Sequence, residues 1–167
     1  MVGNTATYVD VPFHRYAAGK DLSEVGLESL ADLEAVVVRA RGLGRRLDVD
    51  AFRGLDVRGR AVLVDTGWDA HWRTDRYFEG NPFLTEAAAQ HLVQSGARLV
   101  GIDSLNIDDT GDLRRPAHTH LLGAEVPIVE HLTGLDQVPD DGFRFTAAPV
   151  KVRGAGTFPV RAFALLP

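Results

Sequence analysis

Four side chains that suit metal-assisted hydrolysis lie at two distant places in the chain. Asp10 and His14 belong to the segment 4–14, and His118 and Glu130 lie far downstream. Two carboxylates and an imidazole are ligands that divalent ions accept, and a second imidazole can transfer protons. If the fold brings the two places together, these residue types could activate a water molecule and exchange its proton.

A known motif runs through the first of these places. Residues 4–14 resemble, position for position, the motif His-x-Gly-Thr-His-x-Asp-x-Pro-x-His of the cyclase family of metal-dependent hydrolases, whose best-known members are bacterial kynurenine formamidases. The matching positions are Thr7, Asp10, Pro12 and His14. Asn4 and Tyr8 stand where the family has its first two motif histidines, and Ala6 stands where it has glycine. The metal motif is therefore degenerate.

Further segments resemble the same family, and together they cover nearly the whole chain. They are Val64–Asp69, Gly101–Asp108, His118–Gly123, Val129–Leu132 and Phe158–Ala162. The resemblance implies an α/β protein with the swivelling β/β/α fold, which is a mixed sheet with flanking helices. It also implies one cyclase-like domain over residues 1–167, without the N-terminal segment that precedes the motif in the family.

The resemblance also implies roles for the site residues. It places metal ligands at Asp10, His118 and Glu130, substituted ligands at Asn4 and Tyr8, and the catalytic acid/base at His14. In the family the metal histidine lies three residues before a leucine pair, which is Leu121-Leu122 here and selects His118 rather than His120. The metal carboxylate follows twelve residues after that histidine, at Glu130.

The chemistry implied by a complete site of this family is hydrolysis of an amide. A divalent ion lowers the pKa of water toward about 7, so that water attacks an amide or formamide carbonyl at neutral pH. His14 would take the proton of that water and return it to the leaving nitrogen. We therefore expect a hydrolase of the C–N bond of an amide, a formamide (arylformamidase-like) or a cyclic amide.

The two substituted positions leave three hypotheses open. Asn4 offers only a weak amide oxygen, and Tyr8, with an ordinary pKa near about 10, is a poor ligand. One histidine and two carboxylates shift the preference from zinc toward manganese or magnesium. The first hypothesis is a hydrolase with an altered metal site, which holds zinc or manganese or has lost its metal. The second is a metal-free dehydratase or cyclase that uses His14 and Tyr8. The third is a non-catalytic small-molecule-binding or structural protein.

Other polar and aromatic residues are candidates for substrate binding. The predicted set is Tyr8, Trp68, Asp103 and His120. Trp68, Trp72, Tyr77 and Phe78 form an aromatic-rich stretch that predicts either core packing, a subunit contact or a pocket wall for an aromatic substrate. We expect His131 at the surface, because in an extended backbone it points away from the side that Glu130 faces.

The composition indicates one compact domain, and the resemblance implies that its partner is a small-molecule substrate. The chain has 167 residues, 45% hydrophobic, with a net charge of -5 and no basic stripe, which argues against nucleic acid and membrane partners. It contains no cysteine, so any metal must use nitrogen and oxygen ligands. We expect a cytoplasmic location, since no apolar run and no signal peptide is visible, and the resemblance implies a homodimer or homotetramer.

Alternating strand and helix signals provide the elements that must position these residues. Residues 61–103 read as strand, helix and strand, with Thr85 as N-cap and Gly96 as the stop, which predicts a right-handed βαβ unit with Asp103 at a strand end. Other predicted elements are an extended segment 6–12, a helix over 27–33, strands at 36–38 and 143–148, a helical turn at 119–123, an edge strand at 126–129 and a β-rich segment at 158–166.

Overall fold

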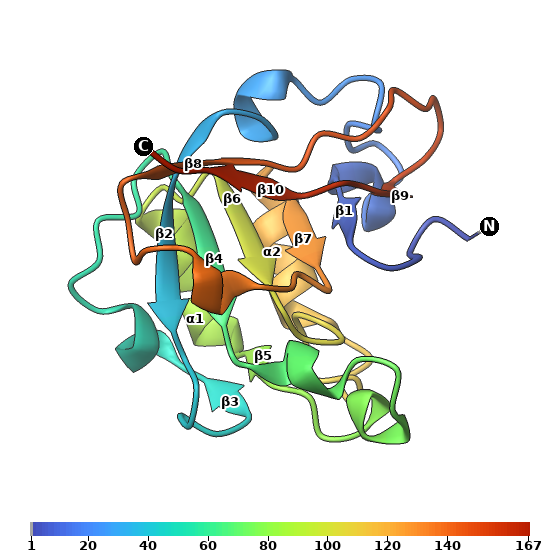
Figure 1. Cartoon of the computed structure of the whole chain (residues 1–167). Coiled ribbons are helices and arrows are strands. Elements are labelled where there is room, and N and C mark those ends of the chain that lie inside the picture. Colours follow the sequence, from blue (N-terminus) through green and yellow to red (C-terminus); the bar gives the residue numbers. More distant parts are fainter. Residues whose placement is uncertain (1) are drawn as a thin grey trace.

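The chain builds one curled, mixed sheet of eight strands, a separate pair of short strands and two α-helices (Figure 1). This computed structural model describes residues 2–167. The strands are β1 (Tyr8–Asp10), β2 (Leu33–Arg39), β3 (Arg46–Leu47), β4 (Ala61–Asp65), β5 (Phe83–Leu84), β6 (Leu99–Ile102), β7 (Ile128–Glu130), β8 (Phe143–Thr146), β9 (Thr157–Pro159) and β10 (Phe163–Leu165). The helices are α1 (Glu86–Gln94) and α2 (Pro116–Gly123).

The centre of the large sheet is parallel and its two sides are antiparallel. The strand order is β10-β8-β2-β4-β6-β7-β1-β9, and the four strands from β2 to β7 run parallel to one another. The outer strands β8, β10, β1 and β9 pair antiparallel. Strands β3 and β5 form the small parallel pair. This architecture confirms the predicted α/β fold with a mixed sheet and flanking helices.

Each face of the sheet packs against its own core. Successive residues of a strand point to opposite faces, so Val36 and Val38 join the core beneath α1 and α2, whereas Val37 joins the core on the other side. That second core is covered by the C-terminal segment, including Phe158 and Val160. In Figure 1 the dark red C-terminal segment crosses the sheet on the side away from the helices.

The last two strands close the sheet onto itself. β9 pairs with β1 at one edge and β10 pairs with β8 at the other, although only residues 160–162 separate them along the chain. Both edges of the sheet must therefore lie close together, which requires the sheet to curl as a barrel does. The predicted β-rich segment 158–166 is thus confirmed, as two short strands.

The predicted βαβ unit is present and carries its expected end signals. β4 and β6 are parallel neighbours, and α1 lies between them in the chain. The hydroxyl of Thr85 accepts a hydrogen bond from the Ala88 amide, as an N-cap does, and Gly96 follows the helix with φ +82°. Asp103 comes directly after β6, at the carboxyl end predicted for it.

The predicted helix over residues 27–33 is wrong. Only Leu27–Ser29 forms a short 3₁₀ turn, and Leu33 already begins β2. Leu27 is exposed whereas Leu30 and Leu33 are buried, so the three leucines do not share one apolar face. Asp32 also has φ +53°, which no α-helix continues.

The predicted edge strand at 126–129 is also wrong in its place and its start. β7 begins after Pro127 and lies inside the sheet, between β6 and β1. Pro127 lacks an amide proton, but its carbonyl accepts a hydrogen bond from Val100, so it leads into an interior strand without breaking the ladder. Glu130 is consequently the last residue of the strand.

No helix within residues 2–167 is long and apolar enough to cross a membrane.

Candidate active site

Two paired strands and one turn bring the N-terminal candidates together. Tyr8 of β1 lies directly opposite Glu130 of β7, and Asp10 lies two residues further on the same face of β1. A 3₁₀ turn over Pro12–His14 then folds the chain back, with the His14 amide bonded to the Val11 carbonyl. The Nδ1 atom of His14 thereby lies 3.4 Å from Asp10 Oδ1.

His118 reaches the same place from α2. Its Nε2 atom lies 3.5 Å from Asp10 Oδ2 and 3.8 Å from Glu130 Oε1, and its ring centroid lies 5.7 Å from that of His14. The two distant parts of the chain therefore converge on one cluster, as the sequence predicts.

Asp108 orients His118, and the sequence did not single it out as a site residue. One of its oxygens lies 2.6 Å from His118 Nδ1, and the carboxylate also accepts hydrogen bonds from the amides of Ala117 and His118 at the start of α2. Because Nδ1 is held by a carboxylate, Nε2 faces Asp10 as the nitrogen that could bind an ion. The available signal was an aspartate just ahead of a helix start, which is common in proteins.

Glu130 is fully buried and both of its oxygens accept hydrogen bonds. The Tyr8 hydroxyl donates to Oε2, and the Ile107 amide donates to Oε1 at 2.6 Å. Burial raises the pKa of Glu130 above its ordinary value, and the neighbouring His118 charge opposes that rise. Burial and the charges of Glu130 and Asp10 raise the pKa of Tyr8. Tyr8 therefore stays a neutral hydrogen-bond donor.

Burial disfavours the charged form of His118, but its carboxylate neighbours outweigh that effect. Asp10, Asp108 and Glu130 all favour the protonated ring and raise the pKa of His118 above its ordinary value. The site is thus a cluster of negatively charged carboxylates around one imidazole, and it strongly attracts a proton or a metal ion.

Asp10 shows that the cluster fits a metal ion. Both of its carboxylate oxygens are buried, and neither has a hydrogen-bond partner within residues 2–167. A buried carboxylate without a partner is costly, and a bound cation would remove that cost. Asp10, His14 and His118 each have a side-chain oxygen or nitrogen atom within 4.8 Å of the others. The Asp10 oxygens and the His118 nitrogen are ligands that zinc or manganese accepts, and a second imidazole at the same place, that of His14, can transfer protons.

A polar cavity of about 220 Å³ opens onto this cluster. Every residue that lines it carries a polar group: Asn4, Tyr8, Asp10, His14, Arg15, Asn106, Arg115, His118 and Glu130. Asn4 is exposed at the cavity wall. Arg15, Asn106 and Arg115 had no motif to mark them, since their proximity depends on how α2 packs against the turn at His14.

Three predicted substrate-binding residues lie outside the lining of this cavity. The Trp68 indole donates to the Tyr77 carbonyl, and His120 contacts Glu86 on α1. Asp103 accepts hydrogen bonds from the backbone amides of Thr66 and Gly67, and burial raises its pKa to about 6. These contacts connect secondary-structure elements to one another.

An aromatic cavity of about 240 Å³ lies beside the polar one. Trp72, Tyr77 and His131 line it, and the Tyr8 ring centroid lies 5.2 Å from that of His131. The surface position predicted for His131 is wrong. Its φ of +56° shows that the backbone is not extended at this residue. Its Nδ1 lies 2.8 Å from the Tyr77 hydroxyl. Burial lowers the pKa of His131 to about 4.

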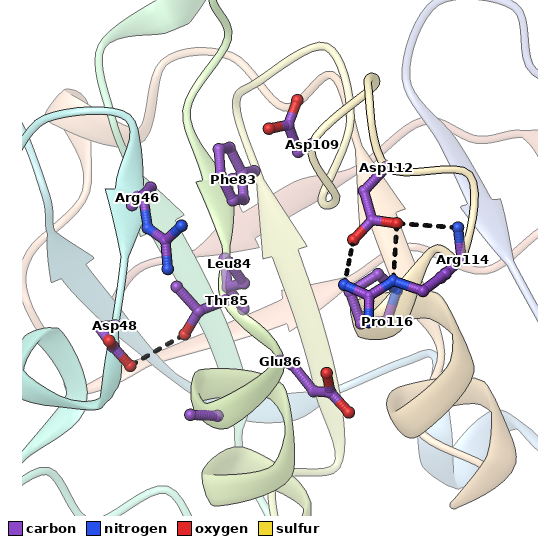
Figure 2. Close-up of a pocket in the computed structure, with 11 residues that line it drawn as sticks. Arg46, Asp48, Phe83, Leu84, Thr85, Glu86, Asp109, Asp112, Arg114 and Pro116 are labelled. Carbon is purple, nitrogen blue, oxygen red and sulfur yellow. Dashed lines mark hydrogen bonds and ion pairs between the residues drawn. The ribbon is translucent and has the colours of Figure 1, made fainter.

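A third cavity, of about 270 Å³, lies at the start of α1 (Figure 2). Charged side chains of both signs line it, and Figure 2 shows Arg114 paired with Asp112 within it. It contains none of the predicted site residues.

Comparison with known proteins supports the same family as the motif. The family described as "Putative cyclase" matches residues 1–109. The kynurenine formamidase of Geobacillus thermodenitrificans (strain NG80-2) is 29% identical over 164 residues, which cover 97% of this chain and 76% of the relative. A structure titled "The Structure Of Potential Metal-Dependent Hydrolase With Cyclase Activity" matches with TM-score 0.82 and 29% identity, over 97% of this chain and 78% of that chain.

A further structural neighbour is isatin hydrolase A from Ralstonia solanacearum. It matches with TM-score 0.87 and 25% identity, over 99% of this chain and 73% of that chain. These neighbours confirm the fold, and the family match spans more than half of the sequence. The chain therefore belongs to the cyclase family.

Proposed function

We propose that this protein is a metal-dependent hydrolase that cleaves the C–N bond of a formamide or a cyclic amide. The single observation that carries the proposal is the buried Asp10 carboxylate, which accepts no hydrogen bond within residues 2–167 and faces His14 and His118. Relatives named kynurenine formamidase and isatin hydrolase support the type of bond.

In this proposal Asp10 and His118 hold the ion, and Glu130 lies within reach of the same place. A bound divalent ion would polarise the amide carbonyl and lower the pKa of water. Asp108 fixes the His118 ring so that Nε2 stays directed at Asp10. Tyr8 donates to Glu130 and keeps that carboxylate in place.

His14 is the proposed acid/base. Its side chain is 38% exposed at the cavity, whereas Asp10 and His118 are buried. Asp10 lies next to Nδ1, which leaves Nε2 to take a proton from the attacking water and pass it to the leaving nitrogen. Tyr8 would be a poor alternative base, because burial and neighbouring carboxylates raise the pKa of its hydroxyl.

The proposal is tested with protein purified without chelator. Metal content is measured, and hydrolysis of N-formylkynurenine and of isatin is followed with zinc or manganese supplied. His14→Ala should retain the metal and lose about 10²–10⁴-fold in kcat. His118→Ala should lose both metal and activity. His91→Ala, on α1 outside the cavity, is the control and should keep both.

Two results would count against the proposal. One is a wild-type protein that binds neither metal and turns over neither substrate. The other is unchanged turnover in both His14→Ala and His118→Ala, which would place the reaction elsewhere.

A further inference from the structure

Two arginines stand at the polar cavity without a carboxylate to neutralise them. Arg15 and Arg115 both line the cavity, and within residues 2–167 neither has an acidic oxygen within 4.0 Å. Arg114, next in the chain to Arg115, differs in this respect: its guanidinium pairs with Asp112 at 2.7 Å (Figure 2). The cavity therefore holds two guanidinium groups that form no direct ion pair within residues 2–167.

The two side chains are held in place by neutral acceptors. Arg15 donates to the Thr119 hydroxyl and, through Nη2, to the Arg114 carbonyl at 2.7 Å. Arg115 donates from Nη1 to Asn106 Oδ1 at 3.0 Å. A guanidinium has five N–H donors, so each arginine keeps donors available while its position is fixed.

The backbone of Arg115 adopts a conformation that few side chains favour. Its φ is +52°, in the left-handed region, at the residue before α2 begins. Such a conformation costs about 1 kcal/mol or more and is retained where the surroundings enforce it. Here it accompanies a side chain that lines the candidate active site.

The charge balance of the loaded cavity favours an anionic ligand. Asp10 and Glu130 are the carboxylates of the cavity lining, and a divalent ion would offset their charge. The charges of Arg15 and Arg115 would then remain. A carboxylate on the ligand would pair with them through charge-assisted hydrogen bonds, which a guanidinium can donate as a fork.

We propose that Arg15 and Arg115 bind the carboxylate of a small substrate, so that this enzyme prefers amides that carry a carboxylate to neutral amides. The preference for a substrate class rests on the proposed hydrolase function, and the charge balance rests on the metal ion of that proposal; the two arginines with donors available at the cavity do not. A cavity of about 220 Å³ in which every lining residue carries a polar group suits a compact charged ligand and offers little apolar wall to a neutral one.

We call Arg15 and Arg115 the arginine clamp. Binding of benzoate and of its neutral counterpart benzamide tests the clamp without any turnover. Calorimetric titration of the wild-type protein should show tighter binding of benzoate, and the difference should shrink as salt is raised. Arg15→Gln and Arg115→Gln should each weaken benzoate by about 10-fold or more and leave benzamide unchanged. Arg114→Gln, which removes the same charge one residue away, should change neither.

Arg15→Lys and inorganic phosphate complete the binding test. Arg15→Lys keeps the charge without the fork, and it should bind benzoate more weakly than wild type but better than Arg15→Gln. Equal affinity for benzoate and benzamide, or equal losses for both in the glutamine variants, overturns the clamp. The carboxylate assignment is overturned if phosphate binds more tightly than benzoate and if Arg15→Gln and Arg115→Gln abolish that phosphate binding. Thermal unfolding confirms that each variant is folded.

Turnover then separates this inference from the proposed function. The ratio of kcat/KM for 2-formamidobenzoate over formanilide should exceed 1 in wild type and fall by about 10-fold in Arg115→Gln. Equal turnover of both amides would refute the clamp and keep the hydrolase. Selective benzoate binding without hydrolysis of either amide would refute the hydrolase and keep the clamp.

Discussion

Tyr8 stands at a position where the motif resemblance implies a histidine, and in this structure it is a hydrogen-bond donor. Its hydroxyl donates to Glu130, and its ring packs beside His131. This position therefore offers no ring nitrogen to an ion, and it gives the buried Glu130 carboxylate a hydrogen bond. Asn4, at the other substituted position, lines the cavity from an exposed position. Together these changes leave Asp10, His14 and His118 as the group whose ligand atoms lie close together.

Tyr8→Phe should destabilise the fold by about 1–3 kcal/mol, because Glu130 Oε2 would lose its hydrogen bond while it remains buried. Tyr16→Phe is the matched control. Its hydroxyl donates to the Thr119 carbonyl in an exposed position, so the loss should stay under about 1 kcal/mol. Urea denaturation of the two variants measures the difference. Equal effects would mean that the Tyr8–Glu130 contact is not a stabilising one.

Among the single residues of the site, the sequence predicted those that belong to a motif. It missed those that lie at the site only because of the tertiary fold. Asp10 and His14 are close in the chain, and family spacing located His118. Asp108 and Arg115 approach the site because of how the loop before α2 folds, with Arg115 at positive φ. No periodicity or spacing encodes that loop geometry, so sequence patterns could not have found them.

At the scale of elements, the C-terminal segment holds the His14 turn in position. The Gly156 carbonyl accepts a hydrogen bond from the Val11 amide. A Cβ on Gly156 would lie 2.3 Å from the His14 amide nitrogen and 2.5 Å from its Cα. Only glycine allows this approach of two backbones. The segment that closes the sheet thus also fixes the candidate base.

Gly156→Ala should lower the unfolding free energy by about 1–3 kcal/mol. The added Cβ would clash with backbone atoms, which cannot move away as a flexible side chain can. It should also lower any activity that depends on His14. Gly111→Ala serves as control, since its Cβ would make only an ordinary contact, 3.5 Å from Asp109. We expect that control within about 0.5 kcal/mol of wild type. A stable, unperturbed Gly156→Ala protein would contradict the close packing.

The elements were predicted well where local signals agree with burial and poorly where tertiary pairing decides. Thr85 and Gly96 bound α1 as their types predict. The leucines of 27–33 instead divide between solvent and core, and Pro127 leads into a strand with neighbours on both sides. Whether a strand is an edge depends on where β1 docks, which is set by contacts far away in the chain.

For the whole molecule, Asp103 links stability to pH. Burial raises its pKa to about 6, above the ordinary value of 3.8, although Thr66 and Gly67 donate hydrogen bonds to it. The folded state then binds the proton more tightly than the unfolded state between these two pH values. The contribution of Asp103 to stability is therefore greatest below about pH 4 and is lost as the pH rises through 6.

Asp103→Asn should remove this dependence. The unfolding free energy of wild type minus that of the variant should fall by about 2 kcal/mol as the pH rises from about 4 to about 7. Urea denaturation of both proteins over this range measures the difference. A difference that stays constant or grows with pH would show that Asp103 is not protonated more readily in the folded state.

The central claim is that the buried Asp10 carboxylate binds a metal ion. The most direct test compares the unfolding of wild type and of Asp10→Asn, each with and without metal. In chelator the variant should be at least as stable as wild type, because it replaces a buried carboxylate whose oxygens accept no hydrogen bond within residues 2–167. Zinc or manganese at about 100 times its dissociation constant should stabilise wild type by about 2.7 kcal/mol and leave the variant unchanged. Equal stabilisation of both proteins, or of neither, would contradict the claim.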